Sequence, residues 1–155
     1  MKKTGILIAI SILAITRLFA QEEKIEGYWL TSEKRSQIQI FQKSNGKFYG
    51  KIVWLEEPYT DDGTLVRDKE NPEATKRDQK IVGLQILKGF SYDTEDQRWE
   101  NGTIYDPETG KTYKCRMWFE DNPNTLNVKG YIGVSFVGRT TQWTRETKKH
   151  ALTSQ

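Results

Sequence analysis

Histidine is nearly absent from this sequence. The only one among 155 residues is His150, in a polar stretch near the C-terminus, residues 146–155, that we expect to be a flexible tail. A Ser–His–Asp or Cys–His nucleophile needs a histidine base beside it, and zinc and copper sites draw on His and Cys ligands. The sequence therefore argues against these classes of enzyme and metal site, and it predicts no cofactor.

Cysteine is just as scarce. Cys115 is the only one, and a single thiol forms no internal disulfide. It stands within Tyr113–Phe119, a run in which apolar residues alternate with Lys114 and Arg116. On a strand this alternation turns residue 115 toward the core. We therefore expect a buried structural cysteine rather than a reactive one.

The chain also lacks a charge excess of its own. It has 24 Lys and Arg against 21 Asp and Glu, a formal charge of +3. Lys2, Lys3 and Arg17 account for that excess, and the first 20 residues contain no acid. The rest of the chain is formally neutral, so the basic charge is no argument for a nucleic-acid partner.

Residues 1–20 have the three parts of a cleavable signal peptide. Lys2 and Lys3 supply the positive start, Gly5–Ile15 an almost unbroken apolar run, and Ala20 the small residue before the cut. A membrane anchor would need about 20 apolar residues, roughly twice the length of this run. We therefore expect an exported protein, periplasmic or secreted, without a membrane span after cleavage.

No long helical period of apolar residues follows the signal segment. Instead, short alternating runs are separated by turn signals, such as Asn45-Gly46 and Asp106–Gly110. We expect one domain over residues 21–145. Its predicted strands are residues 25–30, 37–42, 48–55, 84–92, a run through Trp99, 103–105, 113–119, 126–132 and 139–144.

The loop of residues 56–80 breaks this rhythm. Asn71-Pro72 has the residues of a helix start, which predicts one short helical turn there. About eight strands joined mostly by tight turns favour an all-β fold, an antiparallel up-and-down barrel. A β-sandwich is the alternative, and it is disfavoured because the long crossovers of Greek keys are scarce.

A set of motifs spread over the chain resembles a known family. The motifs are Gly27-Tyr28-Trp29, Trp54, Asp68-x-x-Asn71-Pro72, Gly83-Leu84, Tyr105-Asp106-Pro107-x-x-Gly110-Lys111-x-Tyr113, Gly130-Tyr131-x-Gly133 and Gly138-Arg139-x-x-x-Trp143-x-Arg145. In this order they resemble the exported bacterial proteins known as domain of unknown function 2147. The resemblance runs from about Gly27 to Arg145 and implies one secreted β-barrel-like domain without an assigned activity.

The two ends of this pattern also resemble the lipocalins. Those proteins have a Gly-x-Trp on the first strand and an arginine at the end of the last. The resemblance implies that Trp29 plugs one end of the barrel and that Arg139 or Arg145 covers it through a cation–π contact. The role implied for these residues is structural, namely closure of the barrel.

Aromatic residues are abundant: five Trp, seven Tyr and six Phe. Alternate residues of a strand share a face, so two sets are predicted to point into the barrel together. They are Phe48, Ile52 and Trp54, and Tyr113, Met117 and Phe119. These side chains would either line a ligand cavity or fill the barrel themselves, because eight strands enclose just enough space for side chains. The sequence leaves both open.

Our leading hypothesis is a non-enzymatic barrel that binds a small apolar or amphipathic molecule. A second is a protein–protein module of the cell envelope, which would use Trp118 and Tyr131 or the 56–80 loop. A third is a carboxylate enzyme with an acid of raised pKa in a cleft. Its candidates are Glu56, Glu57, Asp61, Asp62, Asp68 and Asp106.

Overall fold

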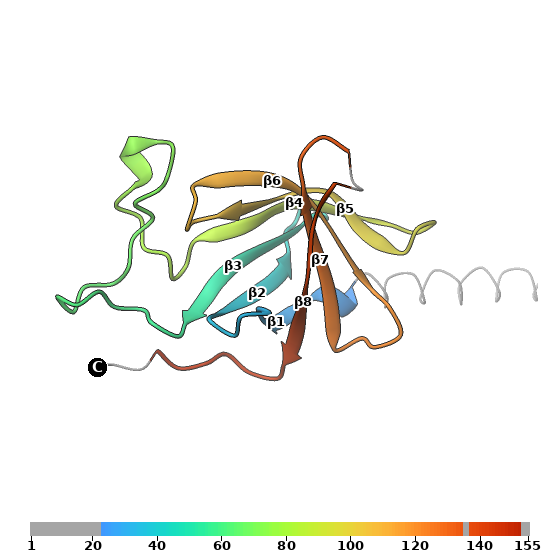
Figure 1. The fold of residues 1–155 in the computed structure, drawn as a ribbon. Coiled ribbons are helices and arrows are strands. Elements are labelled where there is room, and N and C mark those ends of the chain that lie inside the picture. Colours follow the sequence, from blue (N-terminus) through green and yellow to red (C-terminus); the bar gives the residue numbers. More distant parts are fainter. Residues whose placement is uncertain (1–22, 135–136, 153–155) are drawn as a thin grey trace, which may run out of the picture.

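The chain folds into a closed barrel of eight antiparallel strands (Figure 1). The structure, a computed structural model, describes residues 23–134 and 137–152, so the predicted signal peptide lies outside the described residues. The strands are β1 (Gly27–Leu30), β2 (Ser36–Gln42), β3 (Phe48–Leu55), β4 (Gln85–Asp93), β5 (Arg98–Asp106), β6 (Lys111–Phe119), β7 (Thr125–Tyr131) and β8 (Gly138–Glu146). Each strand pairs with the next, and β8 pairs with β1. The predicted all-β up-and-down barrel is therefore confirmed.

Helical structure in the described residues is confined to two single turns, η1 (Glu23–Ile25) and η2 (Ala74–Lys76). The second turn follows Asn71-Pro72, where the sequence predicted one. Within the part of the chain that the structure describes, no helix has the length and apolar character needed to cross a bilayer.

Aromatic side chains fill the barrel near one end. The ring centroids of Trp29 and Phe119 are 5.8 Å apart, those of Phe119 and Trp99 5.4 Å, and those of Trp99 and Phe48 6.3 Å. Such tilted and edge-on contacts add to the stabilisation that burial of the rings provides. Cys115 lies fully buried in the same core, as its alternating neighbours predicted.

We call the end beside η1 the closed end. There the indole Nε1 of Trp29 donates a hydrogen bond of 2.8 Å to the carbonyl of Ile25. Arg145, opposite Trp29 in the β1–β8 pair, places its Cζ 4.2 Å from the centre of the indole ring. Its guanidinium also donates to the carbonyls of Lys24 and Glu26. The side chain of Trp29 thus fills this end of the barrel, and that of Arg145 covers it.

We call the opposite end the mouth. It carries the loops of residues 31–35, 56–84, 107–110 and 132–137, because every odd-numbered strand ends there. The sequence predicted a break between Trp99 and Thr103, whereas β5 is continuous. A bulge near Gly102 keeps the strand paired, and a Cβ on Gly102 would lie 2.4 Å from the ring of Phe90. That glycine therefore marks close packing rather than the end of a strand.

The long 56–84 loop is fastened to the β5–β6 hairpin. The carboxylate of Asp68 is fully buried and accepts hydrogen bonds of 2.7 Å from Asn71 Nδ2 and from the hydroxyl of Tyr105. Burial and this hydrogen bond raise the pKa of Tyr105. A Cβ on Gly110 would lie 2.0 Å from the carbonyl oxygen of Glu70. Several motif residues of the sequence thus hold the loop in place.

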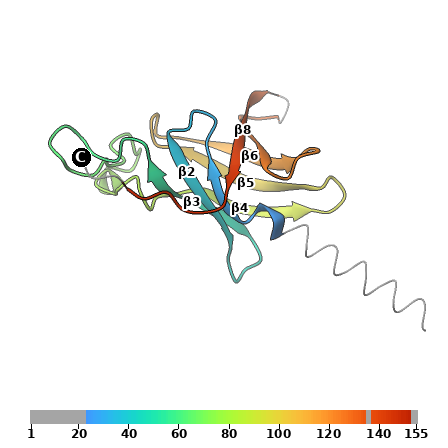
Figure 2. The ribbon, with the colours of Figure 1, turned by 90° about the horizontal axis from the view of Figure 1, so that it is seen from below.

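The segment after β8 runs back along the outside of the barrel (Figures 1 and 2). The side chain of Gln37 bonds Glu146 and, at 2.9 Å, the carbonyl of Lys148, and it accepts the backbone N–H of His150 at 3.0 Å. The imidazole of His150 meets the indole of Trp54 edge-on, with 4.6 Å between ring centroids. The flexibility of residues 146–155 stays a prediction, but the segment contacts β2 and β3 as far as His150.

Candidate ligand-binding site at the mouth of the barrel

The structure brings only part of the predicted cavity lining together. Phe48, Ile52 and Met117 are buried in the core, where other side chains surround them. Phe119 is half-buried and packs between two tryptophans at the closed end. Of the second set, Tyr113 alone lies near the mouth, and it is also half-buried. These six residues therefore do not form one continuous lining.

Trp54 lies on the outward side of β3, contrary to the prediction that it shares a face with Ile52. The register explains the difference, because Ile38 pairs with Ile52 but its neighbour Gln37 pairs with Trp54. Val53 is the extra residue, and one inserted residue in a strand reverses the facing of those that follow. Trp54 consequently contacts the C-terminal segment instead of the barrel interior.

Arg145 covers Trp29, whereas Arg139 does not. Arg139 stands at the beginning of β8, at the mouth, and its side chain forms an ion pair with Glu33. The sequence offered either arginine as the cover of the plug. Because β8 runs from the mouth to the closed end, only the arginine at its far end reaches Trp29.

Four residues form a patch on the inward side of the mouth, which we call the mouth patch: Ile104, Tyr113, Gly130 and Arg139. Ile104 lies opposite Tyr113, and Gly130 lies opposite both Cys115 and Arg139. Directly opposed residues of neighbouring strands share a face. Because Cys115 points into the core, Gly130 and Arg139 lie on the inward face of their strands. A Cβ on Gly130 would touch Ile104 at 3.5 Å and Tyr113 at 3.6 Å. The patch is thus contiguous, with Ile104 and Tyr113 only half-buried.

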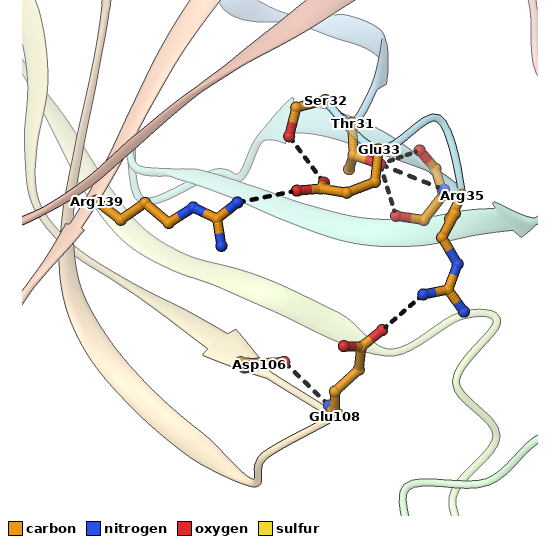
Figure 3. Close-up of polar contacts among 8 residues, drawn as sticks. Thr31, Ser32, Glu33, Arg35, Asp106, Glu108 and Arg139 are labelled. Carbon is orange, nitrogen blue, oxygen red and sulfur yellow. Dashed lines mark hydrogen bonds and ion pairs between the residues drawn. The ribbon is translucent and has the colours of Figure 1, made fainter.

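Two ion pairs rim the mouth (Figure 3). Arg139 Nη2 lies 3.4 Å from Glu33 Oε1, and Arg35 Nη1 lies 3.6 Å from Glu108 Oε1. Figure 3 shows Glu33 between the two arginines, so the loop that carries it is tied to β8 on one side and to the β5–β6 hairpin on the other. Exposed pairs of this kind contribute about 0–1 kcal/mol. A charged ligand group can therefore replace a partner at low cost.

The electrostatics of Glu33 fit this position. A 2.7 Å hydrogen bond from Ser32 Oγ is the main cause that lowers the pKa of Glu33, and the charges of Arg139 and Arg35 lower it further. Glu33 is thus held as a carboxylate, and its charge is what competes for Arg139. Removal of Glu33 would leave the Arg139 guanidinium available to another anion.

Sequence reasoning missed most of this site. Glu33, Arg35 and Glu108 lie in turns where charged residues are ordinary, so no local pattern singles them out. Gly130 stands in the motif Gly130-Tyr131-x-Gly133. A glycine within a strand indicates that other groups pack closely against it, and this signal could have placed Gly130 in the site. Ile104 belongs to the β5 segment that was predicted as a short separate strand.

Asp62, one of the carboxylates proposed for an enzyme, lies in an exposed turn of the 56–84 loop. Hydrogen bonds from the hydroxyls of Thr60 and Thr64 lower the pKa of Asp62 to about 2. Depressions open to solvent lie beside that loop and between Arg98 and Trp118, on the outside of the barrel. Among the described residues, Asp93, Asp96 and Glu100 come within metal-binding distance of one another, but Arg98 pairs with two of them.

Comparison with known proteins places the barrel among lipocalin-like folds. Protein HP1028 from the human pathogen Helicobacter pylori, described as belonging to the lipocalin family, has a similar solved structure with a TM-score of 0.66. The two chains are 25% identical, and the match covers 79% of this chain and 83% of that one. No curated protein matches the chain.

The family assignment comes from the sequence motifs taken together. They extend from β1 to the end of β8, and the structure shows that several of them close the barrel or fasten its long loop. A family model covers the same span, residues 27–145. The chain therefore belongs to DUF2147, a family of uncharacterized proteins conserved in bacteria.

Proposed function

We propose that this chain is an exported, non-enzymatic binding protein that holds a small amphipathic molecule at the mouth of its barrel. The apolar part of the ligand lies against Ile104 and Tyr113, and an anionic head group binds Arg139. The observation that carries the proposal is the position of Arg139. Arg139 lies on the inward face of β8 opposite Gly130, and its one ion-pair partner among the described residues is the exposed carboxylate of Glu33.

The filled closed end limits the shape of this ligand. Trp29, Trp99 and Phe48 occupy the interior there, and Leu87 fills the space beside Gly50. A ligand that ran along the barrel axis would have to displace these side chains, whose burial contributes about 1.5–3 kcal/mol each. We therefore infer a ligand that seats across the mouth.

The test is a binding measurement with cis-parinaric acid, a fluorescent fatty acid with one carboxylate. Arg139→Gln should weaken binding about tenfold, the scale of one hydrogen bond to a charged group. Glu33→Gln should strengthen binding, because it removes the carboxylate that competes for Arg139. Lys47→Gln removes one positive charge at an exposed position in the β2–β3 hairpin, at the closed end, and serves as the control.

The two mouth variants therefore shift affinity in opposite directions. Equal affinity in Arg139→Gln and Lys47→Gln would contradict the proposed head-group site. A wild-type protein that binds no fatty acid, and that native mass spectrometry shows without any small molecule when purified from its host, would contradict ligand binding itself.

Export is part of the proposal and rests on residues 1–20. Their positive start, short apolar run and small final residue support it. Mass spectrometry of the protein from its native host should give a chain that begins near Gln21. A chain that retains the first 20 residues would contradict export by cleavage.

A further inference from the structure

The turn between β7 and β8 exposes three aliphatic side chains. Ile132 is 72% exposed, Val134 53% and Val137 57%. Figures 1 and 2 both show the coloured ends of this turn projecting from the barrel. The strand order places the turn at the mouth, because β7 ends there. Single exposed apolar residues are ordinary, but several together mark a surface that meets another apolar phase.

On one side of this turn, β7 and its neighbour β6 carry only positive charge. Neither β6 nor β7 contains an Asp or Glu, and together they carry Lys111, Lys114, Arg116 and Lys129. Lys114 lies opposite Tyr131, and Arg116 lies opposite Lys129. These three cations therefore share the outward face, since Cys115 and Met117 between them are buried.

The cations of this face form no ion pairs within the described parts of the chain. Within residues 23–134 and 137–152, Lys114, Arg116 and Lys129 have no ion-pair partner, and Arg116 stacks on Trp118 with its Cζ 5.5 Å from the ring centroid. Asp96, which lines the same depression as Arg116, and Glu100 both pair with Arg98. The mouth acids Glu33 and Glu108 also pair with arginines. In a chain that is formally neutral after residue 20, this is a local excess of positive charge.

We propose that this surface docks the barrel on an anionic phospholipid membrane. Ile132, Val134 and Val137 insert among the lipids at the level of the head groups, and Lys114, Arg116 and Lys129 face the phosphates. Apolar side chains beside basic ones are the arrangement by which proteins lie on a membrane surface without spanning it. The half-buried ring of Tyr131 stands between the two groups, where interfacial tyrosines are enriched.

A lipid surface fits these residues better than a protein partner does. A stable protein interface needs a face of roughly 1,000 Å² or more with aromatic anchors at its centre. Among the described residues, the most exposed large apolar side chains are the three aliphatic ones of this turn, and Leu152 is less exposed and lies elsewhere. The docking does not depend on ligand binding at the mouth patch, so either proposal can fail alone.

Cosedimentation with vesicles tests the docking. The processed protein should bind phosphatidylcholine vesicles that contain phosphatidylglycerol, release from them as salt rises, and bind pure phosphatidylcholine weakly. Lys114→Gln and Lys129→Gln should each weaken binding about fivefold. The triple variant Ile132→Ser, Val134→Ser, Val137→Ser should lose most of the binding.

Matched controls lie away from the β7–β8 turn and from the outward face of β6 and β7. Lys47→Gln in the β2–β3 hairpin and Leu152→Ser near the C-terminus remove an exposed lysine and an exposed aliphatic side chain, and both should bind as the wild type does. All variants share one N-terminus, so differences among them report the substituted side chains. Absence of wild-type binding, or full binding by the triple serine variant, would overturn the proposal.

Insertion of the turn is measured separately with a fluorophore. Val134→Cys offers an exposed thiol, while Cys115 is fully buried and does not compete for the label. An environment-sensitive dye at residue 134 should shift to the blue with anionic vesicles, and the same dye on Asn45→Cys, at the closed end, should not. Equal shifts at both positions would contradict this orientation. If the wild type forms a dimer but binds no vesicles, and the triple serine variant stays monomeric, this surface would instead bind a second copy of the chain.

Discussion

The guanidinium of Arg145 lies over the indole ring of Trp29, 4.2 Å from its centroid, where the last strand meets the first. The same side chain donates to the backbone carbonyl of Glu26 at 3.0 Å and to that of Lys24. It therefore covers the plug and also ties down the segment that precedes β1.

Replacement of this arginine should destabilise the barrel strongly. Arg145→Ala removes hydrogen bonds from a charged donor and the cation–π contact, for an expected loss of about 3 kcal/mol in the free energy of unfolding. Arg139→Ala is the matched control on the same strand, and its exposed pair predicts a loss below about 1 kcal/mol. Urea unfolding measures both, and equal losses would contradict the role given to Arg145.

Two glycines with similar backbone angles should respond differently to a methyl group. Gly110 has φ +68° and Gly46 has φ +75°, so alanine at either position incurs about 1 kcal/mol of backbone strain. Only at Gly110 does the new Cβ meet a backbone oxygen, that of Glu70. Gly110→Ala should cost at least about 2 kcal/mol more and increase proteolysis of the 56–84 loop. Similar losses of stability for both variants in thermal unfolding would show that packing of the 56–84 loop against Gly110 does not stabilise the protein.

Cys115 should resist thiol reagents while the protein is folded. Burial raises the pKa of its thiol to about 12, so the reactive thiolate is scarce at neutral pH and the sulfur is covered as well. Because the folded state holds this proton more tightly, stability should fall as pH rises above the ordinary thiol pKa near 8.5. Labelling with an aromatic disulfide reagent, with and without denaturant, measures how far folding protects the thiol. The stability of the Cys115→Ala variant should fall less than that of the wild type as pH rises.

The pKa of Glu33 lies below its usual value, with a named set of causes. Ser32→Ala should raise it most, since the Ser32 hydroxyl is the largest cause, and Arg139→Gln should raise it less. A lowered carboxyl pKa stabilises the folded state above the ordinary value of 4.5, and that contribution disappears as pH falls below it. An NMR titration of the Glu33 side chain measures the order of the two shifts. A larger effect of Arg139→Gln would reverse our assignment.

Alternation of apolar and polar residues predicted the strands well because each strand has one buried face. The departures occur at bulges. Val53 in β3 turns Trp54 outward, and the irregular pairing near Gly102 keeps β5 continuous where a break was predicted. A bulge depends on the partner strand and on what fills the space above it, such as the ring of Phe90 over Gly102. Local sequence carries neither fact.

The candidate site was predicted only in fragments for a related reason. Tyr113 and Arg139 were singled out, but the patch that joins them needs Ile104 and Gly130 from two further strands. The choice between the two arginines depended on the register of β8 against β1, which pairs residues from opposite ends of the sequence. No local pattern in the sequence predicts that His150 packs on Trp54.

Closure of the barrel by the first and last strands has a consequence for how the chain folds. Glu26 and Arg145, which meet at the seam, are 119 residues apart. Until residues 138–146 are available, β1 and β7 each present an unpaired edge, and such edges recruit other chains. Contacts this distant in sequence also slow folding. A nascent chain therefore stays open-edged until its final strand appears, and a truncation before β8 should yield aggregates rather than a smaller barrel.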